Sequence, residues 1–310
     1  MKESPDGYNL TLTNDFIFRS IFGVEKNADI LLSLVNAVLE SKGLQPVIGI
    51  HPVNPLLAAA YMPQKEGILD VRAVDSFGVQ YDLEIQVRSQ ENYIKRSLFY
   101  LSRMYGGQLN RGSEYELLTP CIGISILDFN LFKEGPFFHH LYTFREADHP
   151  DLELSRDMMI HFLELPKFIK LLGSVPVPGP DAADPLKLLE KWLYLLKEID
   201  NPEDAMVQKI LSTTPELDKV HDEYVEFMTN EALRAEALSH EMWLHDQASH
   251  KAEARRQGLA EGKAEGKAEG KAEGKAEERR ELAKKMRENG FDAIMIGKIT
   301  GLSETELEQL

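Results

Sequence analysis

GILDVRAVDSFGVQYDLEIQV, residues Gly67–Val87, has the pattern of a β-hairpin, and the prediction of the fold starts from this hairpin. Side chains alternate across a strand, so Asp82, Glu84 and Gln86 share one face of its second half. The apolar residues between them share the other face, which suits a core. Carboxylates and an amide in a strand that otherwise fits a core raise the question of what the acidic face binds.

The register of this hairpin decides whether its acidic groups meet. If the residue numbers of cross-strand partners sum to 154, Asp70 lies opposite Glu84 and the loop is Ser76-Phe77-Gly78. Three-residue hairpin loops commonly end in a left-handed residue, which Gly78 can supply. A shift by one residue would send the carboxylates to opposite faces. The turn chemistry therefore favours the register in which Asp70 and Glu84 face each other.

Two facing carboxylates repel each other unless a cation joins them or one of them keeps its proton. Oxygen ligands at this spacing suit Mg²⁺, which takes one or two protein carboxylates and keeps several waters. A bound metal can lower the pKa of water and polarise a phosphoryl oxygen, and Gln86 can orient water or phosphate without carrying charge. The alternative is a solvated acidic face, and the spacing alone does not decide between the two interpretations.

Composition limits the classes of function that remain. The chain has 310 residues, 43% of them hydrophobic, which is enough for one large or two modest domains. Its net charge of -16 argues against a non-specific nucleic-acid coat. A single cysteine, Cys121, excludes an internal disulfide and favours a cytoplasmic location. No apolar run approaches the roughly 20 residues of a membrane span, so we expect no membrane contact.

Helices and strands are mixed in the first 170 residues. Apolar periodicity predicts three helices, at 14–22, 27–41 and 91–105. Strands are expected around the hairpin and in four further segments, 46–55, 120–129, 137–147 and 156–165. This order predicts an α/β fold with a central mixed sheet flanked by helices.

From about Pro185 onward the pattern is helical. Residues 258–280 contain a Gly-Lys-Ala-Glu repeat. Each glycine costs a helix up to about 1 kcal/mol relative to alanine, so this segment is either a marginal helix or a flexible linker. The last thirty residues predict a small helix-turn-helix-like unit, with helix ends at Gly290 and Gly301 and a cap at Ser303.

The hairpin belongs to a series of motifs that resembles a known family. ILDV followed by LEIQ resembles the D…ExK core of PD-(D/E)XK nucleases. With NDFIFRSIFG, KRSLFYLSRMYGGQLNRGSEYELLTPCIGISILDF and the tail repeat, the chain resembles the recombination-promoting nuclease / putative transposase family. The resemblance covers roughly residues 12–165 with specific motifs. It implies a restriction-endonuclease-like core that cleaves DNA with Mg²⁺, for which Mn²⁺ can substitute.

The resemblance also assigns roles to residues. Asp70 and Glu84 would bind the metal, and Gln86 stands where the wider superfamily has lysine, which removes a positive charge from the catalytic group. Asp15 matches an acidic position of the family on the first helix, where it would add a metal ligand through water. The alternative for Asp15 is a helix-start residue favoured by the helix dipole.

A basic segment follows the hairpin. Residues 87–113 contain five lysines and arginines and one glutamate. Lys95, Arg96 and Arg103 are expected to contact DNA phosphates, and Tyr100 to stack on a base or sugar. The alternative interpretation pairs the arginines with local acids and packs the tyrosine in the core.

We therefore expect a Mg²⁺-dependent deoxyribonuclease linked to recombination or mobile elements. Its alternative is a catalytically weak or inactive DNA-binding or protein-interaction module that retains the nuclease fold. DNA is the expected partner, together with a second copy of the chain, because cutting both strands with one site per chain calls for a dimer. The expected parts are a nuclease-like domain at 1–170, a helical region at 171–257, the repeat at 258–280 and the C-terminal unit at 281–310.

Overall fold

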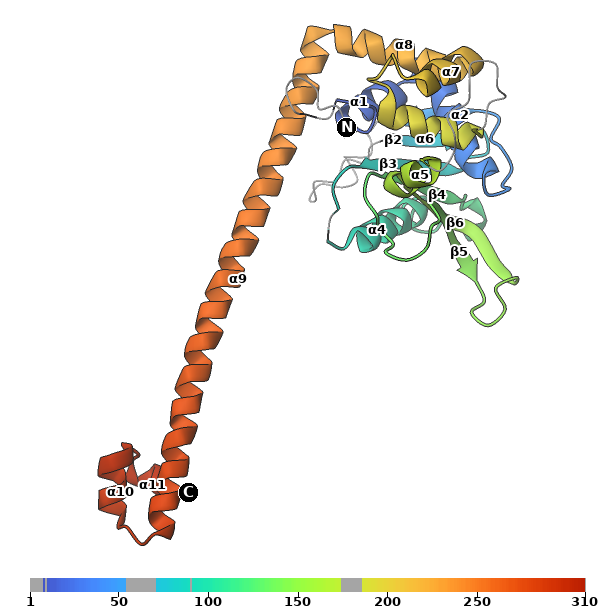
Figure 1. Cartoon of the computed structure of the whole chain (residues 1–310). Helices are drawn as coiled ribbons and strands as arrows, with labels where there is room; N and C mark the ends of the chain where they lie inside the picture. The colour runs from blue at the N-terminus through green and yellow to red at the C-terminus, as the bar shows by residue number, and fades with distance from the viewer. Residues whose placement is uncertain (1–7, 9, 54–70, 90, 174–185, 310) are drawn as a thin grey trace. The chain divides into compact units, whose positions relative to one another are not determined.

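A computed structural model describes residues 8, 10–53, 71–89, 91–173 and 186–309. The chain forms two compact units, Met1–Met242 and Trp243–Leu310. The first unit contains a sheet with helices on both faces (Figure 1). The second unit is helical.

Within the described residues, six strands form one mixed sheet in the order β1-β2-β3-β4-β6-β5. The central strands β3, β4 and β6 run parallel, and the outer pairs are antiparallel. The strands are β1 (Ile50–Val53), β2 (Val71–Asp75), β3 (Gln80–Gln86), β4 (Cys121–Leu127), β5 (His139–Arg145) and β6 (Glu153–Glu164). This arrangement confirms the mixed α/β sheet that the sequence predicts.

The hairpin β2–β3 has the predicted register wherever it is described. Val71 pairs with Leu83 and Arg72 with Asp82, so the partners sum to 154. The loop ends at Gly78, whose φ of +83° is the left-handed conformation that the turn requires. Residues 54–70 lie outside the described part of the chain, and Asp70 is among them.

The main core lies on one face of the sheet, under the helices of the N-terminal and middle segments. Asn14 caps the first helix by accepting hydrogen bonds from the amides of Phe16 and Ile17. Phe22 stacks on Phe18 and contacts the buried Trp192. The helices of this layer and the segments around it are α1 (Asp15–Phe22), η1 (Glu25–Asn27), α2 (Ala28–Glu40), α5 (Leu165–Leu172), α6 (Leu188–Glu198), α7 (Ala205–Thr213) and α8 (Pro215–Thr229).

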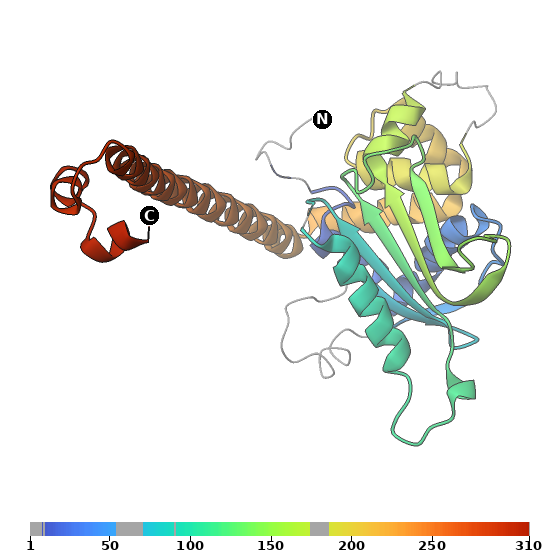
Figure 2. The same ribbon diagram turned by 90° about the horizontal axis from the view of Figure 1, so that it is seen from below.

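The opposite face of the sheet is covered by α4 (Tyr93–Gly106), which Figure 2 shows lying against the sheet. Its residues Leu101 and Met104 pack with Cys121 and Phe162 in a second, smaller core. A short 3₁₀ helix, η2 (Tyr115–Leu117), precedes β4. The helix α4 is also the crossover between the parallel strands β3 and β4, which explains why it returns over the sheet.

The C-terminal part contains α9 (Glu231–Glu288), α10 (Ala293–Thr300) and α11 (Glu304–Glu308). The Gly-Lys-Ala-Glu repeat lies within α9. Gly290 and Gly301 have positive φ, and Ser303 caps α11 in a capping box, as the sequence predicts. Among the described helices, none combines the length and apolar character needed to cross a membrane.

Candidate active site

Glu84 is the centre of the polar group on the α4 side of the sheet. Its carboxylate accepts a hydrogen bond of 2.9 Å from the Tyr93 hydroxyl and a charged hydrogen bond from Arg96 Nη2. The side chain is 14% exposed. Burial raises the pKa of the Glu84 carboxyl, while Arg96 and Tyr93 act to lower it. The carboxylate is thus partly desolvated and faces a cation.

Gln86 lies two residues further along the same face of β3. Its side-chain oxygen accepts a 3.1 Å hydrogen bond from the same Arg96 nitrogen. The Arg96 guanidinium also lies over the Tyr93 ring, with Cζ 5.1 Å from the ring centroid. Arg96 is therefore held by a carboxylate, an amide oxygen and an aromatic face.

The start of α4 explains how Tyr93 and Arg96 reach β3. Asn92 has a φ of +65°, the one positive φ of a non-glycine residue in the described chain, and it turns the chain into the helix. Tyr93 is buried with its ring edge-on to Phe129 and Phe162, at centroid distances of 5.9 and 6.3 Å. Arg96 follows one turn later on the same helix face, so both side chains point back at the strand.

Asp82 adds a second buried carboxylate to this face. It lines a small cavity with Glu84, Tyr100 and Ser125. Burial, reinforced by the nearby Glu84 charge, raises the pKa of Asp82 to about 7. Its Oδ1 atom is buried and has no hydrogen-bond partner among the described residues. A buried carboxylate oxygen in this position costs free energy unless a proton or a cation satisfies it.

The donor chemistry of this face fits a hard divalent cation, since two residues with carboxylate side chains, Asp82 and Glu84, line one small cavity. In the described ranges, no group of three His, Cys, Asp or Glu residues is placed to hold a metal. The predicted ligand Asp70 lies outside those ranges. Of the predicted metal ligands, the structure describes Glu84, which has Asp82 beside it, and Asp15.

The structure gives Asp15 a different environment. Its Oδ1 lies 3.0 Å from His240 Nε2 and also accepts a 2.8 Å hydrogen bond from the amide of Phe16. A neighbouring ion pair joins Arg88 to Glu241 at 3.1 Å. These contacts join the start of α1 and the segment that follows β3 to the N-terminal part of α9. They fit the helix-start interpretation of Asp15.

The four predicted DNA-binding residues divide between two sides of α4. Arg96 joins the Glu84 group, and Tyr100 is 7% exposed and packs, as the alternative interpretation has it. Lys95 and Arg103 lie on the exposed side. Arg103 stacks over Phe99, whose ring is half exposed and whose centroid is 5.8 Å from the guanidinium carbon. Two cations and one exposed ring thus follow each other at intervals of one turn.

Two of the residues around Glu84 were not predicted from the sequence to have a functional role. Tyr93 and Asp82 carry no motif of their own, and each contributes through its position. Asp82 shares the polar face of β3 with Glu84, which the period of two already shows. Tyr93 lies three residues before Arg96, and that spacing places both on one helix face.

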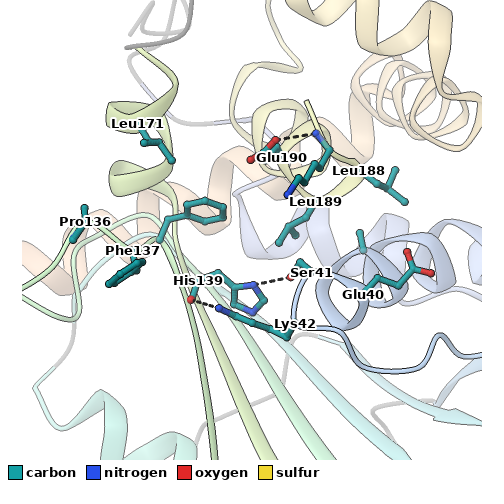
Figure 3. Close-up of a pocket in the computed structure, with 13 residues that line it drawn as sticks. Glu40, Ser41, Lys42, Pro136, Phe137, His139, Leu171, Leu188, Leu189 and Glu190 are labelled. Carbon is teal, nitrogen blue, oxygen red and sulfur yellow. Dashed lines mark hydrogen bonds between the residues drawn. The ribbon is translucent and has the colours of Figure 1, made fainter. Parts of the chain in front are cut away.

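A larger cavity lies between α2, β5, α5 and α6, on the helix layer opposite α4. It encloses about 620 Å³. Figure 3 shows His139, Ser41 and Lys42 together at one side of it, with leucines and phenylalanines around the rest. Glu40 and Glu190 lie among the lining residues with Lys42 and Lys187. The mixed charges do not select one class of ligand.

Comparison with known proteins identifies the family. The chain matches the PD-(D/E)XK nuclease family transposase over residues 12–254, more than three quarters of its length, and therefore belongs to that family. The family membership supports a nuclease or mobile-element role. No curated protein and no solved structure matches the chain.

Proposed function

We propose that this PD-(D/E)XK family member is a metal-dependent DNA endonuclease that hydrolyses phosphodiester bonds. The observation that carries the proposal is the Glu84 group: a buried carboxylate and the side-chain oxygen of Gln86 project from one face of β3 toward a single guanidinium. The hairpin register supports the further assignment of Asp70 as the opposite metal ligand, because the described pairs sum to 154.

Each residue then has a defined task. Asp70 and Glu84 would hold a divalent ion, with Mg²⁺ as the first candidate and Mn²⁺ as a substitute, and that ion supplies Lewis-acid chemistry to a phosphodiester. Gln86 orients a water or phosphate oxygen by hydrogen bonding. Lys95 and Arg103, exposed on α4, hold the DNA backbone. Double-strand cutting would require two copies of the chain.

Nicking of supercoiled plasmid tests this proposal. Wild type and the isosteric variants Asp70→Asn and Glu84→Gln are compared in Mg²⁺, Mn²⁺ and Ca²⁺. Both variants should lose at least roughly 100-fold in cleavage rate, because each removes a metal-binding charge. Glu116→Gln, which changes an exposed acid on the same unit, is the matched control and should cleave normally. Unchanged nicking by a folded Glu84→Gln protein contradicts the proposal.

A second candidate function is a DNA-binding module without cleavage. The specific observation in its favour is the neutral Gln86 at the position of the superfamily lysine. This module would bind DNA equally well in chelator and in Mg²⁺, and it would give no product at long times. Thermal stabilisation by Mn²⁺ that disappears in Glu84→Gln supports the nuclease instead.

A further inference from the structure

Gln86 is neutral at a position where the superfamily pattern has a positively charged lysine. A lysine at this place in the superfamily pattern would put a cation beside the metal-binding carboxylates. Such a cation stabilises the negative charge that develops on a phosphate under attack. Glutamine can donate and accept hydrogen bonds but carries no charge. A nuclease with Gln86 therefore needs a cation from another element, or it loses this stabilisation.

The structure contains a cation at this point. We propose that Arg96 is a catalytic residue that supplies, from α4, the positive charge that position 86 lacks; this inference rests on the proposed nuclease function. Nη2 of Arg96 donates to Glu84 and, at 3.1 Å, to the side-chain oxygen of Gln86. The guanidinium thus lies against both members of the E-x-Q motif, although ten residues separate it from Gln86.

The surroundings of Arg96 hold it in place without sealing it off. The Tyr93 ring lies beneath the guanidinium, 5.1 Å from Cζ, and is itself fixed edge-on against Phe129 and Phe162. The Arg96 side chain nevertheless remains 28% exposed. A fixed guanidinium that solvent reaches can meet a phosphate oxygen with little reorganisation, and its planar fork suits that geometry.

The same contacts show why one chain would not use both cations. Gln86 presents an oxygen to Arg96. A lysine at 86 would present an ammonium to the guanidinium instead, and two like charges at this distance repel. An arginine at position 96 and a lysine at position 86 are therefore alternative sources of the positive charge beside Glu84. This predicts that a lysine at position 86 can supply that charge once the Arg96 side chain is removed.

Four proteins test the prediction: wild type, Arg96→Ala, Gln86→Lys and the double variant. Arg96→Ala should lower kcat for plasmid nicking by roughly 100- to 1,000-fold, the effect of losing one transition-state donor. Gln86→Lys alone should also lower kcat, because it opposes Arg96. Gln86→Lys added to Arg96→Ala should raise kcat at least roughly tenfold above the single Arg96 variant. A double variant no faster than Arg96→Ala, with both folded, overturns the inference.

Metal binding distinguishes catalysis from a structural role. A nearby positive charge weakens cation binding, so Arg96→Ala should bind Mn²⁺ roughly tenfold more tightly than wild type by calorimetry while it cleaves more slowly. If Arg96 only holds Glu84 in place, the variant should bind Mn²⁺ more weakly. Weaker binding therefore contradicts the catalytic role.

Arg111→Ala is the matched control, since it removes the same charge from an exposed position that has no assigned role. It should leave kcat and Mn²⁺ binding near wild type. An equal loss of kcat in both arginine variants argues against the inference. The proposed function fails separately, if wild type shows no cleavage that depends on Glu84.

Discussion

The histidine pair beside the larger cavity should make the fold sensitive to mild acid. His139 Nε2 lies 2.9 Å from His161 Nδ1, and His139 Nδ1 lies 2.9 Å from Ser41 Oγ. Ser41 donates its own proton to the carbonyl of Val38, so it accepts from His139, which in turn accepts from His161. Protonating His139 would place two N–H groups in the 2.9 Å contact. His139 is therefore neutral in the folded protein, and a proton on His161 Nε2 is disfavoured because that atom is buried and has no hydrogen-bond partner among the described residues.

The size of the effect follows from the pKa values. Burial, with the positive charge of neighbouring groups, lowers the pKa of His139 to about 2 and that of His161 to about 4. In the unfolded chain both histidines have a pKa of about 6.5. Below that pH the unfolded state gains a proton on each ring and the folded state does not, so stability falls as pH falls. Between pH 7.5 and 5 the loss is about 2 kcal/mol for each histidine, about 4 kcal/mol for the pair.

Urea unfolding at pH 7.5, 6 and 5 measures this loss, with the fluorescence of the buried Trp192 as the signal from the main core. The double variant His139→Gln/His161→Gln is the comparison, because all other titrating groups are shared with wild type. It should lose about 4 kcal/mol less than wild type over this range. His51→Gln, which changes an exposed histidine, should lose as much as wild type. Equal losses in wild type and the double variant would refute the reasoning.

Two further substitutions test the turn and the sheet end by urea unfolding. Gly78→Ala should destabilise by roughly 1–3 kcal/mol, because its φ is +83° and the new Cβ would lie 3.2 Å from Thr119 Cγ2; a neutral result would mean that the turn relaxes. Glu164→Ala should cost roughly 3–5 kcal/mol, because this fully buried carboxylate lies 2.7 Å from Lys167 and 3.1 Å from His140. A change below about 1 kcal/mol would show that the cluster behaves like a surface ion pair.

The hairpin and the distribution of residues over its faces follow from the amino-acid order alone. A side-chain period of two and a glycine suited to positive φ were enough to predict the β2–β3 register and the loop at Gly78. The same local rules predicted the C-terminal helix ends at Gly290 and Gly301. These features depend on residues a few positions apart, so the information for them is local.

Which charges meet, in contrast, depends on the packing of distant elements. Nothing in the local pattern tells whether Arg96 faces DNA or Glu84, because that depends on how α4 packs on the sheet after the turn at Asn92. The contact between Asp15 and His240 joins residues 225 positions apart. Local periodicity tells which face of an element a side chain occupies. The packing of one element on another selects its partner, and here that packing places the Arg96 cation beside the neutral Gln86.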